Sequence, residues 1–339
     1  MLVNVGKLMS HTSTKGGGGV KHPFNPSLVD AWFMSGLSNS DKPTQIVGVK
    51  NNKLQLKNFA YALDSGFGKY TVNWDSFYGS NGVNANFTNS DSVIHLTEIL
   101  VADGKFLQTN ADGTIEACQI KVEGITDDIK LRYVSYAEDG TGTYTYLKNG
   151  INNLPISYKK YTGFAASVVG TCNITITQLP SAYEGALVFD GVDDYGICTG
   201  LPILDDYTVI CRRVLENKIN NVVASKAVIV ANGAFIFEIY DNNKNCTWSF
   251  KVQNDVDINY NDSVSYQTKN SYNGSTITVG NADDTDTLTL GIIREGDSRL
   301  LKGAIYYFAL YDKSLTPEEI EEEKVKLENY WEGGKNELA

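Results

Sequence analysis

Closely spaced aspartates are the residues of this sequence whose type and spacing suggest metal chemistry. Asp190, Asp193 and Asp194 lie in the segment F-D-G-V-D-D-Y, and Asp205 and Asp206 follow a short distance on. Ca²⁺ prefers clustered carboxylate and carbonyl oxygens as ligands, so these side chains could form a calcium site. Aspartates also cap tight turns by accepting hydrogen bonds from backbone N–H groups. We expect no cofactor, and Ca²⁺ bound by Asp190, Asp193 and Asp194 remains the alternative.

Sugar binding is the second chemistry that the residue types allow. Sugar rings stack on aromatic faces, while amides and carboxylates exchange hydrogen bonds with the hydroxyl groups. The candidates lie in turn-rich sequence and are Trp74, Tyr78 and Asn81, together with Tyr260 and Tyr272, which bound a segment containing several asparagines. The alternative is that these rings cover strand edges and subunit contacts, because the 20 tyrosines of the chain cannot all be ligands.

β-Strands must position these residues, because apolar alternation and turn signals run through most of the chain. Residues 53–59, K-L-Q-L-K-N-F, alternate polar and apolar side chains, as expected for a strand with one buried face. Five further short runs lie between residues 117 and 179 at a spacing of about ten residues, which is typical of an immunoglobulin-like sandwich. The turns between and before them contain Asp112-Gly113, Asp139-Gly140 and Asn149-Gly150.

One helix is predicted, at the C-terminal end. Thr316 and Glu319 form a T-x-x-E capping box, and Pro317 suits the first helical position. Ile320, Leu327 and Trp331 would share an apolar stripe that packs on the sheet. Gly333 and the glycine after it are expected to end the helix.

Composition bounds the class of protein. With 339 residues, two domains are expected. The formal net charge of −11 argues against a general nucleic-acid binder. The five cysteines are widely spaced without a C-x-x-C motif, so we expect buried apolar residues rather than a disulfide framework or a zinc site. No apolar run approaches the roughly 20 residues of a membrane span, and no secretory signal is recognised, so synthesis in the cytoplasm is expected.

Residues 1–22 are predicted to be a flexible arm. They contain four consecutive glycines and three lysines but no acidic residue. One interpretation is a disordered tail. The other is a docking peptide that becomes ordered on a larger assembly. Its docking residues would be Leu2, Val3, Val5, Lys7 and Leu8, of which the four apolar ones would find an apolar groove.

Two distant segments are predicted to be neighbouring strands of one sandwich. They are A-L-V-F-D-G-V-D-D-Y, which begins at Ala186, and G-A-I-Y-Y-F-A-L-Y-D-K-S-L-T-P-E-E-I, which begins at Gly303. Together they resemble the laminin-G-like and concanavalin A-like jelly rolls. The resemblance implies an all-β protein, a concanavalin A-like jelly-roll sandwich of residues 23–90 and 181–315 interrupted by an immunoglobulin-like unit of residues 91–180, with a C-terminal helix and tail at 316–339.

Glycoside hydrolases of this wider fold imply a pattern of carboxylates, E-x-D-x-E or similar, on one strand. Glu295 and Asp297 supply two members without a third, and exposed loop charges are the simpler interpretation. The three histidines, His11, His22 and His95, are scattered, so a catalytic triad has little to build on. We therefore do not expect an enzyme.

The overall layout also resembles virion surface and fibre proteins of tailed phages of gut bacteria. That resemblance implies a structural and adhesive protein of the virion surface, which docks to capsid or tail proteins through its arm and contacts host polysaccharide or another virion protein. A homo-oligomer, by analogy a trimer, is expected, with neither nucleic acid nor membrane as a partner. The alternatives are a bacterial surface carbohydrate-binding module and a degenerate glycoside hydrolase.

Overall fold

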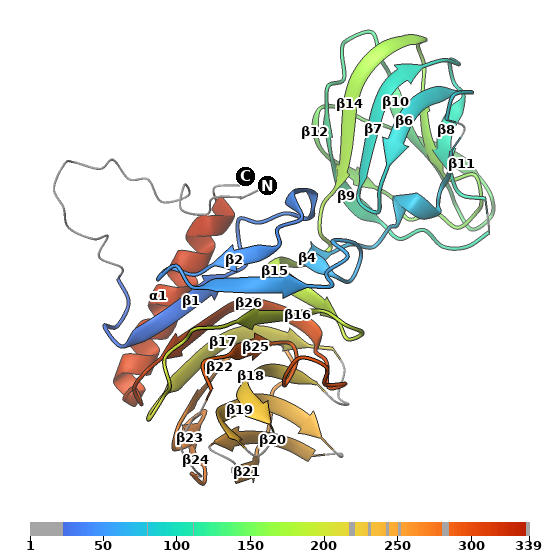
Figure 1. The fold of residues 1–339 in the computed structure, drawn as a ribbon. Coiled ribbons are helices and arrows are strands. Elements are labelled where there is room, and N and C mark those ends of the chain that lie inside the picture. The colour runs from blue at the N-terminus through green and yellow to red at the C-terminus, as the bar shows by residue number, and fades with distance from the viewer. Residues whose placement is uncertain are drawn as a thin grey trace, which may run out of the picture. The chain divides into compact units, whose positions relative to one another are not determined.

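The computed structural model describes residues 23–79, 81–110, 112–216, 221–229, 232–241, 244–249, 252–279 and 285–336. The predicted all-β fold is confirmed, since antiparallel strands form four sheets and an α-helix follows the last strand (Figure 1). The chain divides into two units. The first comprises the chain up to Phe67 and from Tyr183 onward, and the second comprises Gly68–Ala182. Residues 1–22, including the predicted docking residues, lie outside the described residues.

The first unit contains two eight-stranded sheets. In the helix-side sheet the order is β24 (Ser275–Thr276), β23 (Ser271–Tyr272), β22 (Ser263–Thr268), β17 (Thr208–Leu215), β26 (Lys302–Tyr311), β15 (Ala182–Asp190) and β4 (Gly66–Lys69), and β1 (Leu28–Phe33) also pairs with β26. In the opposite sheet the order is β2 (Gln45–Val47), β3 (Lys53–Lys57), β16 (Tyr195–Cys198), β25 (Leu288–Leu290), β18 (Val222–Ile229), β19 (Asn232–Asp241), β20 (Lys244–Ser249) and β21 (Val252–Asp255).

The two predicted motif segments pair as expected. Leu187 of β15 lies opposite Ile305 of β26, and Ala31 of β1 lies opposite Ala309 farther along β26. Strands from the beginning, middle and end of the chain therefore close one apolar core between the two sheets, with Trp32, Leu187 and Phe308 among its members.

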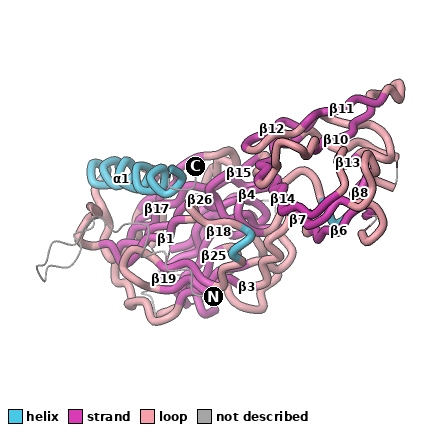
Figure 2. Tube along the Cα trace, turned by 90° about the horizontal axis from the view of Figure 1, so that it is seen from above, coloured by secondary structure: helices cyan, strands magenta, loops and turns pink. Residues whose placement is uncertain are grey.

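Strand β26 is buried on both faces, which explains why its sequence is almost continuously apolar. One face joins the core between the sheets, and the other packs against α1 (Pro317–Asn336), which Figures 1 and 2 show beside the sheet. The pairing of β26 with β17 shifts between Arg212 and Arg213, where Tyr306 is the additional residue of a bulge. Arg212 pairs with Tyr307 on the helix side, whereas Arg213 pairs with Ile305.

The capping box of α1 is present as predicted. Glu319 N donates to Thr316 Oγ1 at 3.3 Å, and Thr316 N donates to Glu319 Oε2 at 2.9 Å. The predicted stop at Gly333 is wrong, because the helix continues to Asn336. A Cβ atom on Gly334 would approach Ser35 Oγ to 2.6 Å, so this glycine allows close packing rather than ending the helix.

The second unit is a separate sandwich with its own core. The β10 sheet has the order β11 (Gly142–Tyr146), β10 (Leu131–Tyr136), β13 (Gly163–Ala166), β8 (Lys105–Gln108) and β5 (Tyr78–Gly79). The β9 sheet has the order β12 (Gly150–Leu154), β9 (Cys118–Glu123), β14 (Gly170–Gln178), β7 (Val93–Ile99) and β6 (Ala85–Asn89). Side chains from both sheets fill the interior, among them Phe164 and Ile176. Short 3₁₀ turns occur at Asn39–Asp41 in the first unit and Trp74–Ser76 in the second.

The expected boundary at residue 90 is wrong, because the second unit begins at Gly68. Strand β6 pairs with β7 and β5 pairs with β8, so both β5 and β6 are held by strands that follow them in the chain. The other boundary, expected between residues 180 and 181, lies between Ala182 and Tyr183.

The five cysteines are not paired with one another, and all except Cys172 are buried, as expected for small apolar residues. Of the helices in the described residues, none is both long enough and apolar enough to cross a membrane.

Candidate functional site

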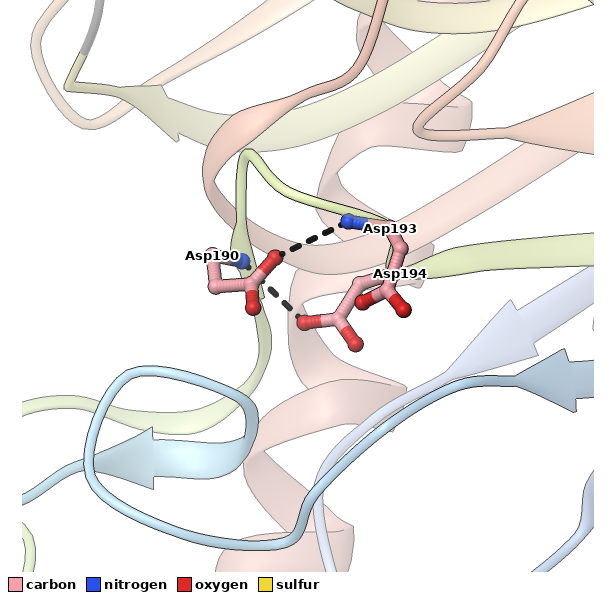
Figure 3. Close-up of side chains that lie close together, drawn as sticks. All are labelled: Asp190, Asp193 and Asp194. Atoms are coloured by element: carbon pink, nitrogen blue, oxygen red, sulfur yellow. Dashed lines mark hydrogen bonds between the residues drawn. The ribbon is translucent and has the colours of Figure 1, made fainter.

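The three predicted metal-binding aspartates lie together at the turn between β15 and β16 (Figure 3). One oxygen from each side chain lies within 4.8 Å of an oxygen from each of the others. Asp194 is buried, Asp190 is half-buried and Asp193 is exposed. The sequence prediction that these residues cluster is therefore confirmed, and their hydrogen bonds indicate what the cluster does.

The carboxylates accept hydrogen bonds from the turn itself. Val192 N donates to Asp190 Oδ1 at 2.7 Å. Asp190 N donates to Asp194 Oδ2 at 3.1 Å, and Ser65 Oγ donates to Asp194 Oδ1 at 3.0 Å. Burial, with a smaller contribution from the neighbouring carboxylates of Asp190 and Asp193, outweighs these hydrogen bonds and raises the pKa of Asp194 to about 7. This arrangement favours the turn-capping interpretation, because the two Asp194 oxygens already accept hydrogen bonds from the protein.

Two of the predicted sugar-binding rings cannot stack on a ligand. Trp74 is fully buried in the core of the second unit, where it packs edge-on against Phe77 and Phe164. Tyr272 is 2% exposed, and its hydroxyl donates to Glu238 Oε1 at 2.7 Å in the first unit. Both predictions are wrong, because turn-rich sequence around an aromatic residue does not reveal whether its ring packs inward.

The other three predicted sugar-binding residues are exposed or half-buried. Tyr260 is half-buried, and its hydroxyl donates to Asn245 Oδ1 at 2.7 Å. Asn81 is exposed, and its Oδ1 accepts a hydrogen bond from Phe87 N at 3.0 Å, so it orders a local turn. Tyr78 is 58% exposed on β5 of the second unit.

Exposed aromatic rings in the described residues are concentrated in the second unit. Tyr78, Tyr144, Tyr146 and Tyr161 are 58%, 58%, 62% and 45% exposed. The sequence prediction missed the last three. A signal was available in G-T-Y-T-Y, because tyrosines two residues apart on a strand lie on one face and the alternating threonines offer little apolar surface for a core.

Register places Tyr78, Tyr144 and Tyr146 on the outer face of the β10 sheet. Tyr78 pairs with Gln108, Gln108 with Gly163, Gly163 with Val134, and Val134 with Tyr144. Directly paired residues of antiparallel strands share a face, so this row crosses the whole sheet. The opposite face is the core face, to which Leu107, Tyr133 and Phe164 belong.

A second row on the same outer face carries positive charge. Lys105 pairs with Ala165, Ala165 with Arg132, and Arg132 with Tyr146. The pairing of β8 with β13 shifts between Phe164 and Ala165, which keeps both Lys105 and Gln108 on the outer face. We call the outer face formed by these rows and the adjacent Tyr136 and Tyr161 the tyrosine face.

Cations and rings contact one another on the tyrosine face. The Arg132 guanidinium lies 4.7 Å from the ring centre of Tyr144, and its Nη2 lies 2.9 Å from Asp103 Oδ1. Lys105 Nζ lies 5.1 Å from the ring centre of Tyr136 and 5.8 Å from that of Tyr161. Such contacts hold the side chains in place at an exposed surface. The face therefore offers exposed rings beside hydrogen-bond donors.

The residues considered for glycoside hydrolysis are engaged with the protein. Glu295 accepts a hydrogen bond from the Tyr195 hydroxyl at 3.0 Å. Asp297 pairs with Arg299 at 2.7 Å, and its side chain is only 5% exposed, so the expectation of an exposed loop charge is wrong for this residue. The Arg299 guanidinium lowers the pKa of Asp297 below its usual range.

Comparisons with known proteins give limited information. No protein-family model matches the chain, and no curated protein is similar to it in sequence. Among solved structures, it is similar to Trypanosoma rangeli sialidase in complex with sialic acid, with a TM-score of 0.31, 8% identity, and 82% of this chain and 67% of that chain covered. The same sialidase with the inhibitor DANA gives a TM-score of 0.30 at 8% identity, with 81% and 67% of the two chains covered. Similarity at this level supports no argument about function.

Proposed function

We propose that the protein is a non-catalytic adhesive protein of a virion surface that binds polysaccharide through the tyrosine face of its second unit. The observation that carries the proposal is the group of exposed tyrosines on one sheet face, beside side chains that donate hydrogen bonds. Tyrosine presents an apolar ring and a polar hydroxyl together, which suits a sugar with one apolar and several polar edges. The side chain also loses little conformational entropy on binding.

Weak contacts on a flat face suit an adhesin that is present in many copies. A single shallow site gives low affinity, but several sites on one particle that engage one polymer add through effective concentration. This argument favours the homo-oligomer, here a trimer, that the sequence layout implies. The first unit would then be a laminin-G-like or concanavalin A-like sandwich that carries the second unit, and the arm of residues 1–22 would dock to capsid or tail proteins.

The binding half of the proposal is tested with the purified full chain on a glycan array, with release of reducing ends measured in parallel. We expect binding to at least one polysaccharide without hydrolysis. Hydrolysis would refute the non-catalytic role, and the lack of any bound glycan would refute the adhesive role.

The virion half is tested by mass spectrometry of purified particles from a strain that carries the gene. We expect the chain among the particle proteins. Deletion of residues 1–19 should leave the fold intact and abolish incorporation, because Leu2, Val3, Val5 and Leu8 would supply the apolar contacts with the particle. Normal incorporation of the truncated chain would contradict the docking role.

A further inference from the structure

The Lys105 ammonium on the tyrosine face is held by neutral groups. Its Nζ donates to the Tyr136 hydroxyl at 2.8 Å and to the backbone oxygen of Tyr161 at 2.7 Å. Lys105 and Tyr136 lie on strands separated by β13, whose outer-face residues here are Gly163 and Ala165, so small side chains leave room for this contact. An ammonium has three N–H donors, and these two bonds use two of them without neutralising the charge.

We propose that the tyrosine face binds an acidic polysaccharide, one whose sugars carry carboxylate groups, and that Lys105 is the residue that recognises the carboxylate. The inference rests on the proposed function and names its ligand class. A carboxylate beside the ammonium would form a charge-assisted hydrogen bond, which is about twice as strong as a neutral one. The two neutral acceptors fix the position of Nζ, so little side-chain entropy is lost when the ligand binds.

The charges around Lys105 support an anionic ligand. Lys160 Nζ lies 5.3 Å and Lys105 Nζ lies 5.8 Å from the ring centre of Tyr161, so two ammonium groups lie close to this exposed ring. Arg132 adds a third cation, which forms an ion pair with Asp103. Lys105 and Arg132 on the tyrosine face, with Lys160 beside Tyr161, outnumber the neighbouring acidic groups Asp103 and Asp112, in a chain whose net charge is −11.

The rings indicate that the anion belongs to a sugar rather than to a protein partner. Tyr144 and Tyr146 are separated by one residue on β11 and point the same way, with their Cα atoms about 7 Å apart along the strand. Between the rings, the face is polar where it is exposed, and Val134 and Ala165 are buried. A protein interface would have an apolar centre, whereas a polyhydroxylated chain needs separate rings with donors between them.

Affinity electrophoresis of the full chain tests the proposal. The gels contain polygalacturonate, alginate or hyaluronate, or the same polymers after reduction of their carboxyl groups to alcohols. We expect retardation by at least one acidic polymer, loss of retardation after carboxyl reduction, and weakening with added salt. Lys105→Met should weaken binding about tenfold or more, because it removes a charged hydrogen-bond donor. A thermal melt confirms that the variant is folded.

The matched control is Lys121→Met, which removes the same charge from the β9 sheet of the same unit. Lys121 is 50% exposed and lies 3.3 Å from Glu123, so binding should change less than about twofold. Tyr146→Thr should weaken binding to the same acidic polymer, since it removes an exposed ring and keeps a strand-forming residue.

The outcomes separate this inference from the proposed function. Equal retardation by acidic and carboxyl-reduced polymers, with Lys105→Met unchanged and Tyr146→Thr weakened, would overturn the acidic ligand and keep the adhesive role. Binding to neutral glycans alone on the array would do the same. An absence of binding to any polymer or arrayed glycan would overturn both proposals.

Discussion

Removing one partner of the buried Arg213–Glu238 ion pair should destabilise the first unit more than any surface substitution. Both side chains are fully buried, and the guanidinium binds both carboxylate oxygens at 2.6 Å. The other donors of Arg213 bond to Ser263 Oγ, Ser265 Oγ and the backbone oxygen of Asn261, so each of its five N–H donors has an acceptor. Glu238 also accepts a hydrogen bond from the Tyr272 hydroxyl.

The pair also holds the backbone in a costly conformation. Glu238 has a φ of 52°, in the left-handed region, at the point where the pairing of β19 with β20 shifts. Glu238→Gln leaves a buried guanidinium without a counter-ion, which costs about 3–5 kcal/mol of unfolding free energy. Arg213→Met should cost a similar amount. The double variant should cost less than the sum of the two, with an interaction energy of about 2 kcal/mol or more.

Urea unfolding followed by far-ultraviolet circular dichroism measures these differences. Lys244→Met is the matched control, because Lys244 and Asp255 form an ion pair at 3.2 Å whose side chains are 62% and 61% exposed. It should change the unfolding free energy by less than about 0.5 kcal/mol. If Glu238→Gln costs no more than this control, or if the two single effects simply add, the reasoning from burial is wrong.

Three further predictions concern the helix and the aspartate turn. Arg212→Ala should destabilise the docking of α1 by about 1–2 kcal/mol and raise amide exchange in the helix, because Arg212 lies 4.5 Å from the Tyr306 ring centre and 4.6 Å from that of Trp331. For Asp194, the folded-state pKa of about 7 exceeds the ordinary 3.8, so the folded protein retains a proton that the unfolded chain has lost. Stability should therefore fall as pH rises from about 4 to about 7, by at most about 4 kcal/mol, and Asp194→Asn should flatten this fall in thermal melts. Millimolar calcium at pH 8 should give neither heat in calorimetry nor a higher melting temperature, and a clear rise would contradict the turn-capping interpretation.

Local signals in the sequence were sufficient for the start of the helix and for the strand character of β26, whereas the pairing that closes the first unit was implied by the resemblance to laminin-G-like sandwiches. The capping box at Thr316 and Glu319 specifies a helix start through side chains three residues apart. The apolar run of β26 indicates a strand covered on both faces, and the structure covers it with a sheet and α1. Each of these signals depends on neighbours within a few residues.

The unit boundary could not be predicted because it depends on pairing between distant residues. Strands β5 and β6 lie in turn-rich sequence, and nothing in that sequence specifies β8 and β7 as their partners. The same reason explains the aromatic residues. Trp74 and Tyr78 are four residues apart in similar sequence, yet one ring is fully buried and the other is 58% exposed. The side of the sheet that each residue faces follows from register, which the sequence alone did not supply.

Hydrogen–deuterium exchange of the full chain, with and without a polysaccharide that it binds, tests most directly whether the tyrosine face is the binding surface. The account predicts slower exchange in residues 105–108, 131–146 and 158–164, with little change in the first unit. Protection confined to the first unit, or to the β9 sheet of the second, would contradict it.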